Sequence, residues 1–264
     1  MPELTSGSAG TAAAEFRFHG RLHDFLAPGL RDAPIRRAVA PRQTVKDAIE
    51  ALGVPHPEVE RVTANGRPVG FGYRLRDGDE IAVYPAGPVP ERPGPTGHGD
   101  APRFVVDGHL GRLAAYLRAL GFDTWYRIHA PDQELAQRAA ADDRLLLTRD
   151  RGLLKRSIVR QGYCVRSDRP AEQLAEVVRR FRLVESARPF GRCLRCNGLL
   201  ERIDAALVVD RLPPRVQHEQ REFRHCPDCD GLYWKGSHYE RMLRLLEASG
   251  AGLASRQQTS ADRR

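Results

Sequence analysis

The sequence predicts an α/β protein with three parts: a small α+β domain, a parallel sheet flanked by helices, and a cysteine-rich segment. Three observations lead to this expectation. Strand and helix signals alternate from residue 103 to residue 185, which is typical of a parallel sheet covered by helices. Strand, helix and hairpin signals fill residues 15–85, and residues 186–247 hold four of the five cysteines.

Proline and glycine mark the boundary between the first two parts. Residues 85–102 hold six prolines and four glycines, a composition that favours a semi-extended linker. We therefore place the linker at residues 86–102. The two ends of the chain, residues 1–14 and 248–264, are small and polar, and we expect both to be disordered tails.

The first domain shows its elements in order. Residues 15–18 alternate like a half-buried strand, and Thr44 can cap a helix over residues 45–52. The Asn-Gly pair at 65–66 predicts a hairpin, and residues 81–84 predict a closing strand. This order, with its Asp-Gly-Asp-Glu-Ile-Ala-Val-Tyr-Pro ending, resembles ubiquitin-like β-grasp domains of the sulfur-carrier type. Such carriers react through a free C-terminal Gly-Gly, whereas this chain continues past Tyr84, so we expect a docking module with a protein partner.

The second domain shows four strand signals, each followed by a helix signal. Strands are expected at 104–106, 122–126, 145–148 and 163–165, and helices at 110–120, 132–141, from residue 150 and 174–181. Several aspartates stand where these elements meet. Asp107 and Asp150 follow apolar strands, Asp123 follows the glycine that ends the first helix, and Asp132 opens the second helix.

These aspartates allow two interpretations. Strand carboxyl ends of a parallel sheet share one edge, where ligands bind, and carboxylates gathered there repel one another unless a cation lies between them. This favours a site for Mg²⁺ or Mn²⁺, which prefer oxygen ligands. Aspartate also commonly caps helices, so Asp123 could be only a turn residue and Asp132 only a first-turn charge.

Four stretches of residues 103–247 resemble the PIN-like ribonuclease domain named after the C-terminal region of the nematode Mut-seven protein. They are Phe-Val-Val-Asp-Gly-His-Leu-Gly-Arg-Leu-Ala, Leu-Gly-Phe-Asp-Thr, Leu-Leu-Leu-Thr-Arg-Asp-Arg and Tyr-Trp-Lys-Gly-Ser-His-Tyr-Glu-Arg-Met. Prokaryotic members of that family often carry a ubiquitin-like domain in front. The resemblance implies metal-dependent cleavage of RNA, with Asp107, Asp132 and Asp150 as catalytic metal ligands and Asp123 as a fourth candidate. The glutamate that the PIN pattern carries in an intervening helix has no clear counterpart here.

Three arginines flank the acidic positions and could hold RNA phosphates: Arg112, Arg149 and Arg151. They could equally be surface arginines of an arginine-rich chain, which has 39 Arg and 3 Lys. The net charge of +8 and the pI of about 9.6 favour an acidic partner such as nucleic acid. The same excess of arginine would raise the pI without any such partner.

Two Cys-x-x-Cys motifs, Cys193/Cys196 and Cys226/Cys229, predict a structural zinc site, because four thiolates complete a tetrahedral Zn²⁺ shell. We expect a zinc ribbon with a hairpin between the motifs and a closing helix near residues 238–247. Tyr233 and Trp234 could stack on RNA bases or pack the ribbon against the nuclease sheet, and packing is favoured for Trp234. The fifth cysteine, Cys164, reads as a buried core thiol.

Together these features predict a metal-dependent ribonuclease with a β-grasp module and a zinc ribbon. The alternative is a non-catalytic RNA-binding or adaptor protein that uses the ribbon and the β-grasp domain. No apolar run approaches the roughly 18 residues of a membrane span, and the first residues lack a secretion signal. We therefore expect a cytoplasmic protein without a membrane partner.

Overall fold

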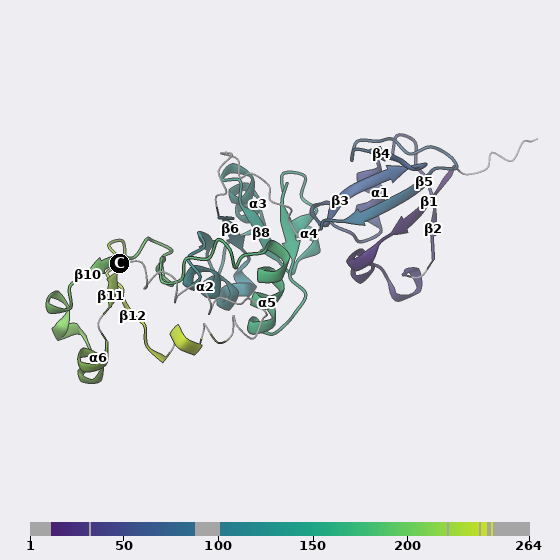
Figure 1. Cartoon of the computed structure of the whole chain (residues 1–264). Helices are drawn as coiled ribbons and strands as arrows, with labels where there is room; N and C mark the ends of the chain where they lie inside the picture. The colour runs from purple at the N-terminus through teal and green to yellow at the C-terminus, as the bar shows by residue number, and fades with distance from the viewer. Residues whose placement is uncertain are drawn as a thin grey trace, which may run out of the picture. The chain divides into compact units, whose positions relative to one another are not determined.

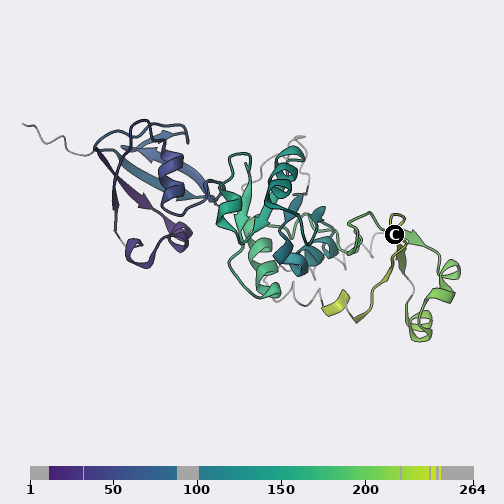
Figure 2. The same cartoon turned by 180° about the vertical axis from the view of Figure 1, so that it is seen from behind.

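The computed structural model describes residues 12–31, 33–87, 101–220, 222–237, 239–241 and 244. The chain divides into two compact units, Met1–Gly87 and Pro88–Arg264 (Figures 1 and 2). Several expected segments lie mostly outside the described residues. They are the two tails (1–14 and 248–264), the linker (86–102) and the closing helix (238–247). Within them, no helix has both the length and the apolar character needed to cross a membrane.

The first unit contains a five-stranded mixed sheet with the order β2-β1-β5-β3-β4, and the single α-helix of its described part is α1. Strands β1 and β5 run parallel at its centre, and the other neighbours are antiparallel. The elements are β1 (Ala13–Phe18), β2 (Ile35–Ala38), α1 (Val45–Ala51), β3 (Val59–Ala64), β4 (Arg67–Val69) and β5 (Glu80–Pro85). This is the expected β-grasp arrangement.

Local chemistry explains the elements that the sequence predicts here. Thr44 caps α1 in a reciprocal capping box with Asp47, which satisfies two backbone donors at the helix start. Asn65 and Gly66 both adopt positive φ, at 51° and 76°, as the tight turn between β3 and β4 requires. Strand β1 begins at Ala13, so the expected N-terminal tail ends earlier than predicted.

The second unit is built on a four-stranded parallel sheet with the order β7-β6-β8-β9. Its strands are β6 (Phe104–Val106), β7 (Thr124–Tyr126), β8 (Leu145–Thr148) and β9 (Gly162–Cys164). Its helices are α2 (Gly111–Ala119), α3 (Asp132–Ala141), α4 (Arg151–Leu154) and α5 (Pro170–Phe181), and a 3-10 turn, η4 (Gly108–Leu110), precedes α2. The predicted alternation of strands and helices is confirmed.

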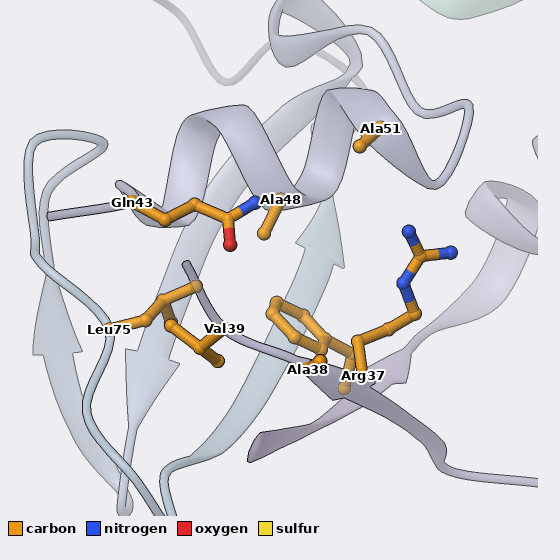
Figure 3. A pocket seen from close by; sticks show the side chains of 8 residues that line it. Arg37, Ala38, Val39, Gln43, Ala48, Ala51 and Leu75 are labelled. Atoms are coloured by element: carbon orange, nitrogen blue, oxygen red, sulfur yellow. The ribbon is translucent and has the colours of Figure 1, made fainter. Parts of the chain in front are cut away.

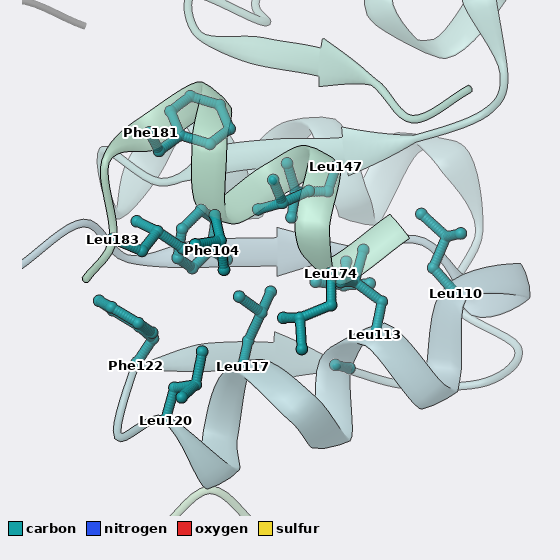
Figure 4. Close-up of a cluster of buried hydrophobic side chains, with 14 of the residues drawn as sticks. Phe104, Leu110, Leu113, Leu117, Leu120, Phe122, Leu147, Leu174, Phe181 and Leu183 are labelled. Atoms are coloured by element: carbon teal, nitrogen blue, oxygen red, sulfur yellow. The ribbon is translucent and has the colours of Figure 1, made fainter. Parts of the chain in front are cut away.

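Helices cover both faces of this sheet. On one face, α2 and α5 pack together over Phe104, Val106 and Leu147 in a continuous apolar core (Figure 4). Side chains alternate between the two faces of a strand, so Val105 and Leu146 point to the other face, where α3 packs against β6 and β8. The two covered faces explain why the strand sequences are continuously apolar.

The cysteine-rich segment forms a three-stranded antiparallel sheet of β10 (Glu201–Ile203), β11 (Phe223–His225) and β12 (Leu232–Trp234). Strands β10 and β11 pair as the expected hairpin, but their connection is helical. It contains the 3-10 turns η5 (Ala205–Leu207) and η6 (Val209–Arg211) and the helix α6 (Pro214–Glu219). This insertion has its own small core around Val208, Leu212 and Phe223, against which Trp234 packs. Among the described residues, Trp234 therefore packs against this core of the ribbon and is not part of the core of the parallel sheet.

Candidate active site and metal centre

Asp107 and Asp150 meet the same buried threonine at the carboxyl edge of the parallel sheet. The Thr148 hydroxyl donates to Asp107 Oδ2 at 2.6 Å and accepts from the Asp150 N–H at 2.9 Å. Thr148 is fully buried, while Asp107 is half-buried and Asp150 is exposed. One hydroxyl at the end of β8 thus fixes the Asp107 carboxylate and the backbone that carries Asp150.

Asp150 also caps the short helix α4. Its Oδ1 accepts from the Gly152 N–H at 2.6 Å, which satisfies a donor at the start of that helix. The helix-cap interpretation therefore holds for one oxygen of Asp150. The side chain remains exposed, so this cap does not remove it from solvent.

Two glycines allow the segment after Asp107 to lie close to strand β7. A Cβ atom on Gly108 would stand 2.3 Å from the Ile128 carbonyl oxygen, and one on Gly111 would stand 2.5 Å from the Tyr126 hydroxyl. The Tyr126 hydroxyl donates to the Gly108 carbonyl at 3.1 Å. This close approach explains the glycines of the Asp-Gly-His-Leu-Gly motif, since larger residues would push the Asp107 loop away from the end of β7.

Asp132 is the first residue of α3, on the chain that leaves the carboxyl end of β7, and it is exposed. Within the described part of the chain, only the four ribbon cysteines form a group of three or more potential metal ligands within 4.8 Å. Asp107, Asp132 and Asp150 form no second group of that kind. The oxygens of Asp107 and Asp150 suit a hard cation, but the structure links only these two residues, through Thr148.

The predicted phosphate-binding arginines lie around this edge with different partners. Arg112 is exposed in the first turn of α2, and Arg151 is exposed at the start of α4. Arg149, 44% exposed, forms an ion pair with Asp168, whose carboxylate is 81% exposed. A pair so open to solvent is worth little in stability, and it leaves Arg149 able to exchange Asp168 for another anion.

Asp123 lies at the opposite edge of the sheet. Thr124, the next residue, begins β7 and lies opposite Phe104 at the amino end of β6. The Asp123 carboxylate accepts hydrogen bonds from Arg144 Nη1 at 2.7 Å, Arg144 Nη2 at 3.2 Å and Asn197 Nδ2 at 2.8 Å. Burial raises the pKa of Asp123, but these hydrogen bonds outweigh it and lower the pKa below its usual value. The structure thus separates Asp123 from the other three aspartates.

The four cysteines meet in the ribbon as the sequence predicts. Sγ atoms lie 3.4 Å apart in the pairs Cys193/Cys229 and Cys196/Cys226, and all four lie within 4.8 Å of one another. Tetrahedral zinc with Zn–S bonds of 2.3 Å separates its sulfurs by about 3.8 Å, so this quartet fits a Zn²⁺ ion. His225 instead contacts Asp230 at 2.8 Å.

The two halves of the quartet have the same backbone design. The N–H of Cys193 bonds to the Gly198 carbonyl and that of Cys226 to the Gly231 carbonyl, each at 2.8 Å. The residue after each second cysteine, Asn197 or Asp230, adopts positive φ. Burial raises the pKa of the Cys193 thiol, but donors including the Cys196 N–H and the Tyr233 hydroxyl lower it to about 6. Burial raises the pKa of Cys196 to about 12 and also raises that of Cys229, so Cys193 is the first of these three to become a thiolate. A thiolate is the form that binds metal.

The first half of the quartet is attached to the amino edge of the parallel sheet. The buried Arg118 donates to the carbonyls of Leu194 and Arg195 at 3.0 and 2.9 Å, and Asn197 Oδ1 accepts from the Thr124 N–H at 2.9 Å. The ribbon and the parallel sheet therefore share hydrogen bonds at this edge.

Sequence reasoning missed Thr148 and Asn197 at these sites, and also Arg144 and Arg118. The position of Thr148, between an apolar strand and Arg-Asp, could have signalled a hydroxyl at the sheet edge. Asn197 could have been found by its match to Asp230, because each follows the second cysteine of its motif and precedes a glycine.

Comparison with known proteins agrees with this architecture. Residues 102–246 match the family model described as the Mut7-C RNAse domain, and residues 11–88 match the model described as Mut7-C ubiquitin. A comparison with curated proteins gives no match. Among solved structures, similarity is found to crystal structures of small archaeal modifier protein 1 (SAMP1) of Haloferax volcanii. They are 27% and 26% identical, cover 28% of this chain and 97% and 94% of their own, and each gives a TM-score of 0.23.

Proposed function

The chain belongs to the family defined by the Mut7-C RNAse domain, and from this we propose that it is a metal-dependent ribonuclease acting at the carboxyl edge of its parallel sheet. The observation that carries the proposal is the Thr148 hydroxyl, which joins the Asp107 carboxylate to the backbone of Asp150. In metal sites, outer partners of this kind hydrogen-bond the ligating carboxylates and hold them in position.

Each residue at this edge would have a defined role in RNA cleavage. Asp107 and Asp150 would hold Mg²⁺ or Mn²⁺, with Asp132 contributing from the start of α3. When bound, such an ion supplies a water of lowered pKa and neutralises charge on the scissile phosphate. Thr148 would keep Asp107 in its orientation. Arg112, Arg149 and Arg151 would bind the neighbouring phosphates through their guanidinium groups.

The ribbon cysteines would hold one structural zinc ion. Four thiolates fill a tetrahedral shell and leave no position for a substrate water, so this ion would act on folding and not on RNA. Metal analysis of the purified chain is expected to give one zinc per chain, and Cys226→Ser is expected to lose it. Full zinc content in Cys226→Ser would contradict this role.

The nuclease proposal is tested with zinc-loaded protein, because a strong chelator would also remove zinc from the ribbon. Single-stranded and structured RNAs are incubated with the chain while Mn²⁺ is added in steps from zero. Cleavage is expected to appear only with added Mn²⁺ and to be lost in Asp150→Asn. RNA binding without cleavage at any Mn²⁺ concentration would instead support a non-catalytic RNA-binding protein.

A further inference from the structure

Among the described residues, strand β2 is an unpaired edge of the sheet in the ubiquitin-like domain. The sheet ends in β2 on one side and in β4 on the other. Strand β4 is only three residues long, and its central residue, Pro68, has no N–H to offer. Proline is a common way to protect a sheet edge from further pairing. Strand β2 carries no proline between Ile35 and Ala38.

The register shows which backbone groups of β2 face outward. Val39 donates to the Ala12 carbonyl at 2.7 Å, and Ala38 lies opposite Ala13. Hydrogen-bonded and non-hydrogen-bonded pairs alternate in an antiparallel ladder. Residues 35, 37 and 39 therefore face β1, while Arg36 and Ala38 direct their N–H and C=O groups away from the sheet. These are the groups that an added strand would bind.

A groove runs beside this edge, between β2 and α1 (Figure 3). The side chains of Phe16, Val39, Ala48, Ala51 and Leu75 contribute an apolar lining. Ala51 is exposed and Val39 is half-buried, so the groove reaches the surface. Arg37 and Val39 lie on the same strand face as the buried Ile35, which turns them towards α1. Alternate side chains of an added strand would point into this groove.

Charge at this edge selects the partner. Arg36 and Arg37 are exposed and form no ion pair with any residue that the structure describes, and the groove lining contains no acidic side chain. Two adjacent arginines oppose pairing of β2 with a second copy of itself. The same two charges would attract a strand that carries carboxylates.

From this geometry we infer that β2 binds an extended acidic segment of a partner protein, which adds to the sheet as a sixth strand. Main-chain hydrogen bonds with Arg36 and Ala38 would give affinity, as in other cases of strand addition. Apolar side chains of the segment would enter the groove beside α1. Its acidic side chains, which alternate with the apolar ones, would lie on the opposite face of the sheet and meet Arg36 there.

The test uses the full-length chain and a short synthetic peptide in which valine alternates with aspartate. Amide chemical shifts and hydrogen exchange are followed by NMR as the peptide is added. We expect the Arg36 and Ala38 amides to shift and to become protected, while the Arg67 amide of β4 does not change. A peptide with lysine in place of aspartate is expected to bind at least about tenfold more weakly.

Two variants separate the backbone contribution from the charge. Ala38→Pro removes one outward N–H and no ladder bond to β1, so the domain should keep its fold. It is expected to weaken peptide binding about tenfold. Arg36→Glu is expected to weaken binding by a similar factor, and its matched control on the other edge, Arg67→Glu, is expected to bind normally. Circular dichroism checks folding in each case.

Three results would overturn the inference. Peptide binding that leaves the Arg36 and Ala38 amides unchanged would place the site elsewhere. Equal affinity of Ala38→Pro and the unmodified chain would exclude strand addition. A single-stranded RNA that displaces the peptide and shows the same dependence on Arg36 would identify this edge as a nucleic-acid surface.

Discussion

Both edges of the parallel sheet carry aspartates, but the aspartates at the two edges have different hydrogen-bond partners. At the carboxyl edge, Asp107 receives a hydroxyl hydrogen bond from Thr148, and Asp150 remains exposed. At the amino edge, Asp123 receives two guanidinium contacts from Arg144 and an amide contact from Asn197. One edge leaves negative charge available to a ligand, and the other compensates it within the protein.

The partners of an aspartate therefore indicate whether its role is functional or structural. They do so better than the residue type or its position next to a strand. An ion pair shielded from water fixes the positions of both side chains. Asp123, Arg144 and Asn197 thus join the end of β7 to the first cysteine motif. The carboxyl edge lacks an arginine of this kind on Asp107 among the described residues, as a cation site requires.

The strongest test of the comparison replaces one aspartate at each edge. Asp107→Asn removes a negative charge from the proposed cation site. Loss of an outer-shell partner of a metal lowers activity by up to about a hundredfold. Asp107 would be a ligand itself, so we expect Mn²⁺-dependent RNA cleavage to fall by more than that factor. Asp123→Asn is expected to change cleavage by less than about threefold per active molecule. Rates are measured at saturating Mn²⁺ with a fluorescent RNA. If both variants lose activity equally, the two edges do not differ in function.

Thr148 sharpens the comparison at the carboxyl edge. Thr148→Val keeps the shape of the side chain and removes the hydroxyl that joins Asp107 to Asp150. We expect cleavage to fall about 10- to 100-fold, with a higher Mn²⁺ concentration needed for half-maximal activity. Thr148→Ser restores the hydroxyl and is expected to recover most of the rate. A Thr148→Ser variant as inactive as Thr148→Val would show that packing, and not the hydrogen bond, matters.

The sequence predicted well those parts of the molecule that depend on local patterns. The capped helix α1, the Asn-Gly hairpin and helix α3 follow from residues adjacent in the chain. Strand β2 was missed, because Ile35-Arg36-Arg37-Ala38 has no alternation and its pairing with β1 is a tertiary effect. The sequence also did not predict at which edge of the sheet Asp123 lies. The position of Asp123 depends on the direction of the strand and on Arg144 and Asn197, which are distant in sequence.

Arg144 tests the amino edge through stability. Arg144→Met leaves Asp123 partly buried without its main cationic partner, and we expect a loss of about 2 kcal/mol, less than for a fully buried pair. Amide hydrogen exchange at Phe104, whose N–H bonds to the Asp123 carbonyl, measures the local effect. Arg215→Met, which removes an exposed i,i+4 pair with Glu219, should cost less than about 0.5 kcal/mol. Similar losses in both variants would mean that Arg144 contributes no more than a surface charge.

The smallest effect concerns the pH dependence of the same edge. Burial raises the pKa of Asp123, but the hydrogen bonds from Arg144 and Asn197 lower it overall. The unfolded chain therefore takes up the proton first, near pH 3.9. The stabilisation is complete above that pH and is lost as pH falls through the lower folded-state pKa.

The protection of the Phe104 amide, which bonds to the Asp123 carbonyl, is followed by hydrogen exchange from pH 6 downwards and is expected to show this loss in the unmodified chain. The slope should be smaller in Asn197→Ala, which keeps the contacts with Arg144, and absent in Asp123→Asn. If Asp123→Asn retained the full slope, another carboxyl group would be responsible. Charge compensation of Asp123 would then not explain how the amino edge differs from the carboxyl edge, where Asp107 lies.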